Sequence, residues 1–176
     1  IPELLFKGCR ALTEVELPKG ITKIEQSVFK GSGIISFHFP EMITEIPSGT
    51  FDHCESLKEV KFPKHFTKIG DRAFWGCKSL ERTITSEGTV YEGEFHIPEG
   101  VTSIDYLSMM FDSDLIKTIH IPSTLVNFQS AALSSSMIER YTMTLPNPNY
   151  DIRNNSVVET ATNTLIAGGT ESTKIH

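Results

Sequence analysis

Long apolar runs are missing from this sequence of 176 residues, and so are clusters of basic side chains. No stretch approaches about 18 consecutive apolar residues, so no transmembrane helix is expected. Lysine and arginine together number 16 against 22 aspartates and glutamates, which gives a net charge of -6. Nucleic-acid binding depends on concentrated positive charge, so this balance argues against a DNA or RNA partner.

Cysteine is scarce, and the familiar catalytic signatures are absent. Three cysteines cannot form a complete set of disulfides within one chain. The sequence contains no Gly-x-Ser-x-Gly, no phosphate-binding glycine loop and no His-Glu-x-x-His. Its carboxylates are spread along the chain, with no pattern that pairs two of them in a buried site. We therefore predict that the chain is not an enzyme and holds no cofactor.

What is present is an internal repeat. The stretch 73–80 (Ala-Phe-Trp-Gly-Cys-Lys-Ser-Leu) repeats the pattern of 50–57 (Thr-Phe-Asp-His-Cys-Glu-Ser-Leu) at an offset of 23 residues. An isoleucine opens each unit except the last, where Phe128 replaces it: Ile1, Ile24, Ile46, Ile69 and Ile104. The intervals are 23, 22, 23, 35 and 24 residues, so the fourth unit carries an insertion, near 86–94. Periods of this length predict stacked units that bury their apolar faces against one another.

Three further columns follow the same register. Five residues after each opening residue lies a large apolar side chain: Phe6, Phe29, Phe51, Phe74, Met109 and Leu133. Later in each unit a proline recurs: Pro18, Pro40, Pro63, Pro98, Pro122 and Pro146. Cys9, Cys54 and Cys77 share one repeat position, which Ser32-Gly33 occupies in the second unit. A shared position favours small buried hydrophobes over a disulfide framework or a metal site.

Apolar and polar residues alternate before each proline, as in 12–17 (Leu-Thr-Glu-Val-Glu-Leu) and 57–62 (Leu-Lys-Glu-Val-Lys-Phe). Alternation of this kind predicts strands with one buried face, which the proline ends. Neighbouring units then pair these strands in parallel. A second apolar pair follows each proline, as in Val101 and Ile104, and predicts a second short strand. We expect a short helical turn after it, carrying the phenylalanine and the cysteine.

The residues of the fourth unit resemble a known family. The stretch 69–80 (Ile-Gly-Asp-Arg-Ala-Phe-Trp-Gly-Cys-Lys-Ser-Leu), with 62–68 before it, is similar to the BspA-like, or Treponema-type, leucine-rich repeat. The resemblance covers Ile1 to about Pro146 in six units, and 147–176 resembles a variant unit with a hairpin between Val157 and Ala167. It implies an α/β repeat fold: a leucine-rich-repeat solenoid with parallel strands, a second short-strand ladder and short helical turns.

The resemblance also implies an organisation and a location. We expect one leucine-rich-repeat domain over 1–176, and because the chain begins and ends within a repeat we expect it to be part of a longer protein. A monomer is expected, able to associate end to end through unpaired strand edges. Family members are surface-exposed or secreted proteins, some with binding or adhesion roles, which implies an extracellular or cell-surface location.

Strand alternation identifies the side chains that point outward from the main sheet. One column holds Glu14, Ser36, Glu59, Glu94, Thr118 and Thr142, and the other holds Glu16, His38, Lys61, His96, His120 and Thr144. In leucine-rich-repeat proteins this face usually contacts the ligand, so Glu14, Glu16, His38, Glu59, Lys61, His96 and His120 are candidate binding residues. The same pattern also fits a face that is merely solvated.

Two features of these columns suggest more specific sites. His96 and His120 lie close enough in adjacent units to share a divalent metal with Glu94, but structural zinc takes four ligands, so we predict no metal site. Trp75 occupies a position that is otherwise polar or methionine and is expected to be exposed. We expect either local packing around Trp75 or a cover from the insertion, through Tyr91, that extends a partner surface.

These patterns favour a non-catalytic interaction module of a cell-surface or secreted protein. The expected ligand is a host protein, matrix or glycan, bound through the solenoid surface. The alternative is a structural spacer with no ligand of its own.

Overall fold

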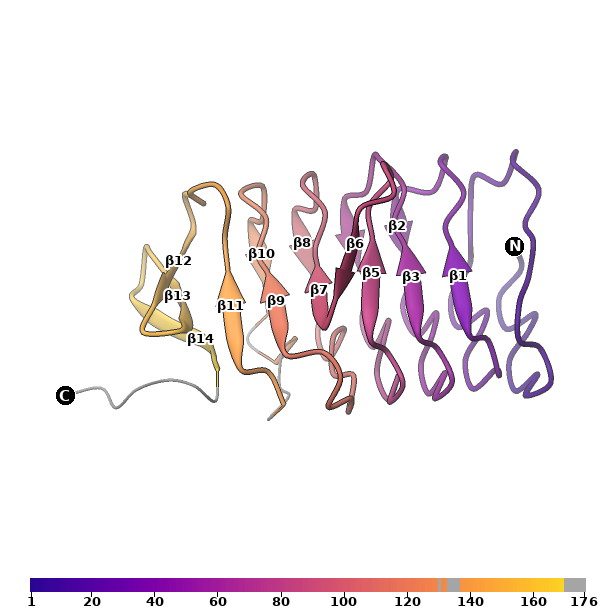
Figure 1. The fold of residues 1–176 in the computed structure, drawn as a ribbon. Helices are drawn as coiled ribbons and strands as arrows, with labels where there is room; N and C mark the ends of the chain where they lie inside the picture. The colour runs from indigo at the N-terminus through magenta and orange to yellow at the C-terminus, as the bar shows by residue number, and fades with distance from the viewer. Residues whose placement is uncertain (130, 133–136, 170–176) are drawn as a thin grey trace.

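Each repeat unit forms one coil, and the coils stack in chain order to make a solenoid (Figure 1). The computed structural model describes residues 1–129, 131–132 and 137–169. Two faces of the solenoid carry strands, which we call the front ladder and the rear ladder. The stacked units that the periodicity predicts are confirmed, and so is the leucine-rich-repeat solenoid that the family resemblance implies.

The front ladder consists of β1 (Ser36–His38), β3 (Glu59–Lys61), β5 (Arg82–Ile84), β7 (Glu94–His96), β9 (Thr118–His120) and β11 (Arg140–Thr142). Each of these strands except β5 lies shortly before a proline. The middle residue of each strand is buried, as the alternation predicts. The strand predicted over 12–17 is wrong, because this segment pairs with the next coil through Ile35 N–H to Thr13 O at 2.8 Å and forms no ladder.

The rear ladder is continuous. Its strands are β2 (Glu45–Ile46), β4 (Lys68–Ile69), β8 (Ser103–Ile104) and β10 (Asn127–Phe128). They pair in parallel and in register in the order β10-β8-β4-β2, so Ile46, Ile69, Ile104 and Phe128 align. This is the second short-strand ladder that the apolar pairs after each proline predict.

The insertion interrupts the front ladder but not the rear one. Strand β5 turns back as β6 (Val90–Glu92), which pairs with it antiparallel, and Gly93 at φ 68° reverses the chain again into β7. On the rear face β4 pairs directly with β8. One coil therefore contributes two strands, β5 and β7, to the front ladder.

Thr83 spans the break between β5 and β7. Its buried hydroxyl donates to Glu94 O at 3.2 Å and accepts from His96 N–H at 2.9 Å. These two hydrogen bonds take the place of ladder bonds that β5 gives to β6 instead.

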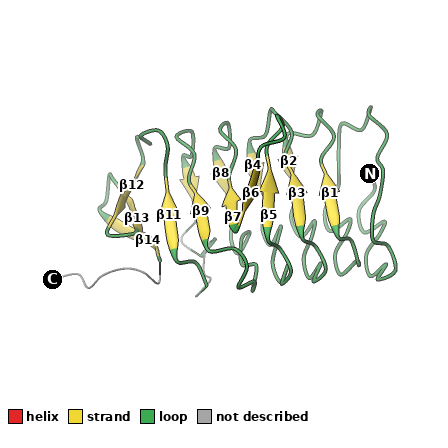
Figure 2. Ribbon diagram, in the orientation of Figure 1, coloured by secondary structure: helices red, strands yellow, loops and turns green. Residues whose placement is uncertain are grey.

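The predicted short helical turns are wrong, since the described residues contain no helix (Figure 2). An α-helix needs each N–H to bond the carbonyl four residues earlier. In these turns alternate N–H groups bond the next coil instead: those of Ser27, Phe29 and Gly31 donate to Ser48, Thr50 and Asp52. Each of the first five turns also holds two residues with positive φ, such as Ser27 (55°) and Gly31 (66°), which a right-handed helix excludes.

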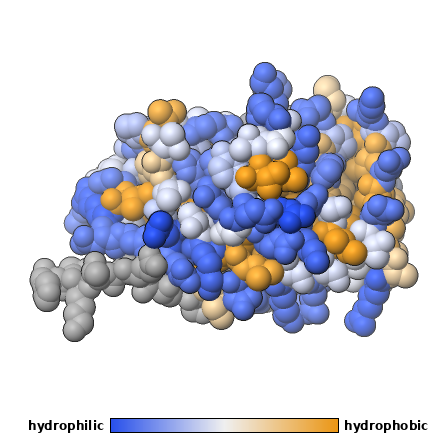
Figure 3. All heavy atoms as spheres, viewed as in Figure 1, coloured by the Kyte–Doolittle hydropathy of each residue, from blue (hydrophilic) through white to orange (hydrophobic). Residues whose placement is uncertain are grey.

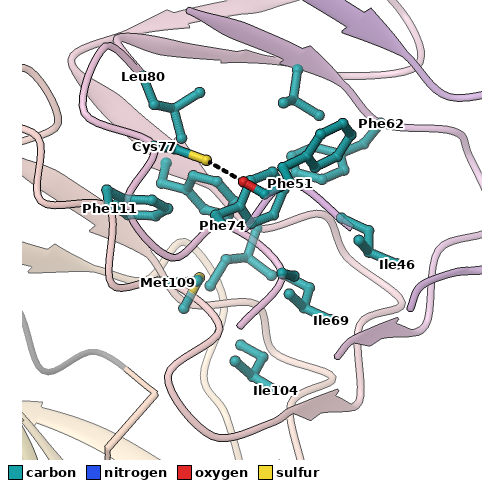
Figure 4. Close-up of a cluster of buried hydrophobic side chains, with 14 of the residues drawn as sticks. Ile46, Phe51, Phe62, Ile69, Phe74, Cys77, Leu80, Ile104, Met109 and Phe111 are labelled. Carbon is teal, nitrogen blue, oxygen red and sulfur yellow. Dashed lines mark hydrogen bonds between the residues drawn. The ribbon is translucent and has the colours of Figure 1, made fainter. Parts of the chain in front are cut away.

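The core is a set of side-chain columns that run along the solenoid. Phe6, Phe29, Phe51 and Phe74 stack with ring centroids 5.4 to 5.7 Å apart. Figure 4 shows Ile46, Ile69 and Ile104 in a second row beneath this column. Met109 continues the phenylalanine column as predicted and is buried, whereas Leu133 lies outside the described residues.

Beyond β11 the chain forms a three-stranded antiparallel sheet of β12 (Tyr150–Arg153), β13 (Ser156–Glu159) and β14 (Thr164–Gly168). The pair β13–β14 is the hairpin predicted between Val157 and Ala167. Within the described ranges the chain has no helix of the length and apolarity that crossing a membrane requires.

This small sheet covers the last coil through two polar side chains. The hydroxyl of Tyr150 accepts from Phe128 N–H at 3.0 Å and donates to Val126 O at 2.9 Å. The amide of Asn155 accepts from Tyr141 N–H at 3.0 Å and donates to Glu139 O. The edges of β10 and β11 therefore have hydrogen-bond partners.

Candidate functional site

The front face, meaning the outward side of the front ladder, carries two groups of interacting side chains. The first is an ionic chain across β1, β3 and β5. Nε2 of His38 lies 3.2 Å from Glu59 Oε1, and Nε of Arg82 donates to Glu59 Oε2 at 2.8 Å. Partial burial opposes ionisation of Glu59, but the hydrogen bonds from Arg82 and His38 outweigh it and lower the pKa of its carboxyl.

Arg82 is the member that the sequence columns missed. It also contacts Glu81 at 3.0 Å and Glu92 at 3.4 Å, so one guanidinium joins three carboxylates. The predicted column passes from Glu59 to Glu94 because it assumes one strand in the fourth unit. An offset of 23 from Glu59, the same offset that reveals the repeat, would have found Arg82.

The second group is a stack of three rings built by the insertion and the two strands after it. The Tyr91 ring from β6 lies parallel to the His96 ring at 3.9 Å, and His96 lies parallel to His120 at 4.3 Å. Strands β7 and β9 set His96 opposite His120 in register. The predicted proximity of the two histidines is therefore present, and Tyr91 joins them.

Polar neighbours fix both imidazoles. Nδ1 of His96 lies 2.9 Å from Glu94 Oε1, and Nδ1 of His120 lies 3.1 Å from Thr142 Oγ1. Burial, and then the charge of His96, lower the pKa of His120, so the neutral ring is favoured. Thr142 pairs with His120 rather than with Thr118, which corrects the predicted column by two residues.

Apolar surface accompanies this stack. Val90 on β6 is 48% exposed and lies opposite Ile84 on β5. Figure 3 shows a mainly hydrophilic face on which separate apolar islands lie, one of them over the middle of the front ladder. An exposed valine at this place results from the insertion.

The remaining predicted residues of the front face lie toward the N-terminal coils. Glu14 and Glu16 are exposed and, with Ser36 and His38, line an open hollow of about 470 Å³. Lys61 is half-buried on β3, between His38 and Ile84 in the ladder. These side chains share the front face, but the structure does not join them to the ring stack.

Trp75 lies away from this face, and the predicted cover from the insertion is wrong. Its half-buried ring packs against His53 at 5.1 Å, with the Arg72 guanidinium 5.0 Å from its centroid, whereas Tyr91 stacks on His96. Local packing, the other expectation, accounts for Trp75. Asp52, in the same repeat position, is buried because Lys30 and His53 both bind its carboxylate.

The buried cysteines have the structural character that their shared position predicts. Sγ of Cys54 donates to Phe29 O at 2.9 Å, and Sγ of Cys77 donates to Phe51 O at 3.2 Å (Figure 4). Burial raises the pKa of Cys54 to about 11 and that of Cys77 well above its ordinary value. Cys9 is exposed, and all three thiols are free.

As a whole, the front face carries side chains that are suited to binding another molecule. It presents an array of paired charges, an aromatic stack and exposed apolar surface on short strands held by the core. Such a combination of a rigid platform with aromatic and arginine side chains is typical of surfaces that recognise proteins or glycans.

Comparison with known proteins agrees with the fold. Residues 1–93 and 93–165 match the model of the BspA type leucine rich repeat region, given as six copies. No curated protein matches the chain.

Two solved structures are similar. A leucine-rich repeat protein from Eubacterium ventriosum matches with a TM-score of 0.57 and 19% identity over 80% of this chain and 40% of that one. A leucine rich cell surface protein from Faecalibacterium prausnitzii matches with a TM-score of 0.44 and 23% identity over 82% of this chain and 48% of that one. The chain thus spans less than half of either protein. Because the family model matches nearly its whole length, the chain belongs to the BspA-type leucine-rich repeat family.

Proposed function

We propose that this chain is a non-catalytic interaction module that binds a protein or glycan through its front face. The observation that carries the proposal is the doubled strand of the fourth coil. It puts Tyr91 and Val90 onto a face that the regular repeats would otherwise build alone. Membership of a repeat family that implies protein-interaction or surface-repeat modules supports it.

We further propose that the parent protein is secreted or displayed on a cell surface, with a host protein, matrix component or glycan as the ligand. This location is supported by the family resemblance, because members of that family are surface-exposed or secreted. Fractionation of cells that express the full-length protein tests the location, and recovery from the cell interior alone would overturn it.

Charge reversal on the front face tests the binding surface. The variant Glu14→Lys with Lys61→Glu alters the face while it leaves the net charge unchanged. Its matched control, Glu45→Lys with Lys23→Glu, makes the same exchange beside the rear ladder. The readout is retention on a panel of immobilised collagen, fibronectin, laminin, mucin and arrayed glycans.

We expect the front variant to lose retention of whichever probe the parent binds, and the rear variant to keep it. Equal retention by parent and front variant would remove Glu14 and Lys61 from the binding surface, and equal retention also by a chain without residues 84–95 would overturn the front face. The alternative function is a structural spacer with no ligand. It is supported by the continuous rear ladder, which makes the solenoid a rigid rod. A parent that retains no member of the panel would favour the spacer.

A further inference from the structure

The ring stack contains a group of metal-ligating atoms. One ligand atom each from Glu94, His96 and His120 lies within 4.8 Å of the other two. Two imidazoles and one carboxylate form a donor set that suits zinc and related transition metals, whereas magnesium and calcium prefer oxygen ligands alone. Strands β7 and β9 hold the three side chains on one face of the front ladder.

The hydrogen bonds of the stack leave the outer ring nitrogens available. A carboxylate only accepts, so Nδ1–H of His96 donates to Glu94 and Nε2 of that ring keeps its lone pair. The hydroxyl of Thr142 can accept from Nδ1–H of His120, so this contact is compatible with the same tautomer there. Metal-bound histidines are usually held in this way, by an oxygen acceptor on the other ring nitrogen.

We propose that His96 and His120, with Glu94, form a binding site for a zinc-class divalent ion on the front face. The two rings now lie parallel at 4.3 Å, so both must tilt for their lone pairs to converge on one ion. Neighbouring parallel strands lie about 4.8 Å apart, which is close enough for the tilted side chains of His96 and His120 to contact the same ion. Glu94 serves either as a direct ligand or as the acceptor that orients His96, and water completes the coordination.

The metal site lies on the same front face as the proposed ligand-binding surface, but zinc binding does not depend on that proposed function. The sequence argues against a metal site because it offers no fourth protein ligand. Closed structural zinc sites require four protein ligands, whereas sites that keep a bound water do not. His120 is buried and His96 half-buried, so the ligands are already partly desolvated and ordered.

Metal titration of the purified chain tests the proposal. The background is Cys9→Ser, because an exposed thiol binds zinc by itself. Zinc chloride is titrated in competition with a chromophoric chelator, and cobalt chloride is added separately to follow its visible absorption bands. We expect one equivalent to bind, with cobalt bands of a tetrahedral or five-coordinate site, and His96→Gln to weaken binding about tenfold or more.

His38→Gln is the matched control, since His38 lies in the same column and contacts a glutamate but has no second histidine across the ladder. We expect it to bind zinc as the parent does. His120→Gln alters a buried residue and therefore risks misfolding. If that variant does not fold, the result for His96→Gln, at a half-buried position, decides the test. The proposal is overturned if the parent binds no zinc at about 100 times the protein concentration, or if His96→Gln binds as tightly as the parent.

Discussion

Thr83 is a polar residue at a buried strand position, where the preceding unit has Val60. By the repeat pattern alone it weakens the strand. The structure gives it a purpose, because its hydroxyl satisfies both Glu94 O and His96 N–H across the gap between β5 and β7. A single side chain thus closes the break that the insertion makes in the front ladder.

Replacing Thr83 with valine keeps the shape and removes the hydroxyl. We expect Thr83→Val to lower the free energy of unfolding by about 1–3 kcal/mol, because two backbone groups lose their partner. Urea denaturation measures the change. Thr118→Val, on the outward side of β9, is the control and should change stability by less than about 0.5 kcal/mol. Equal effects would show that the bridge contributes nothing.

The thiols should differ sharply in reactivity. Thiolate is the reactive form, and burial raises the pKa of Cys54 to about 11 and also raises that of Cys77. In the native protein at pH 8 we expect a thiol reagent to label Cys9 alone, and all three cysteines after unfolding. Rapid labelling of Cys54 or Cys77 in the folded chain would contradict their burial.

At the scale of the elements, the ladders follow from the sequence and the turns do not. Registered columns predict both ladders, because each coil repeats the same side-chain pattern against its neighbour. The turns escape prediction because their backbone conformation depends on hydrogen bonds to the next coil, such as Phe29 N–H to Thr50 O. A helical turn and this hydrogen-bonded turn place the phenylalanine and cysteine at similar spacing.

The candidate site, too, is predicted only in part from the sequence. The proximity of His96 and His120 follows from strand register, which the columns contain. The stacking of Tyr91 on His96 depends on the path of β6 after it leaves β5, for which the repeat offers no template. The long interval in the fourth unit therefore locates the insertion, but the sequence does not predict which residues the insertion contacts.

The phenylalanine column is the element that most directly joins neighbouring coils. We expect Phe51→Ala to cost about 3–5 kcal/mol, because a fully buried ring stacked on both sides is replaced by a cavity. Phe6→Ala should cost less, because Phe6 is only half-buried and stacks on one ring. Chemical denaturation of both variants checks the order, and a larger loss at Phe6 would contradict it.

Asn155 covers the edge of β11 with a side-chain amide. Its φ of 57° permits glycine, so Asn155→Gly removes the amide without adding backbone strain. We expect a loss of about 1–3 kcal/mol, because Tyr141 N–H and Glu139 O lose this partner. Asn154→Gly, an exposed neighbour with a φ of 47°, is the control and should have a smaller effect. Thermal unfolding of the two variants compares them.

For the molecule as a whole, the rear ladder and the core columns define a regular rod, and the fourth coil departs from it on one side only. Rear strands β4 and β8 already pair in register, as they would without an insertion. The additional chain is therefore accommodated on the front face, where it supplies β6 and the doubled strand. We take this departure, rather than the regular repeat, as the source of whatever specificity the module has.

Deletion of residues 84–95 tests this claim most directly. The deletion joins Thr83 to His96, returns Ile69 and Ile104 to the 23-residue spacing of the preceding interval, and keeps the alternation before Pro98. Thr83→Val in the same chain removes the hydroxyl that has lost its partners. Circular dichroism and cooperative unfolding establish that the shortened chain folds, and the measurement is its retention on the panel of matrix proteins and glycans.

The account predicts a folded solenoid that no longer retains the probe that the full chain binds, because Tyr91, Val90 and the doubled strand are gone. A shortened chain that folds and retains the probe as strongly as the parent would contradict it, and would assign binding to the regular repeats.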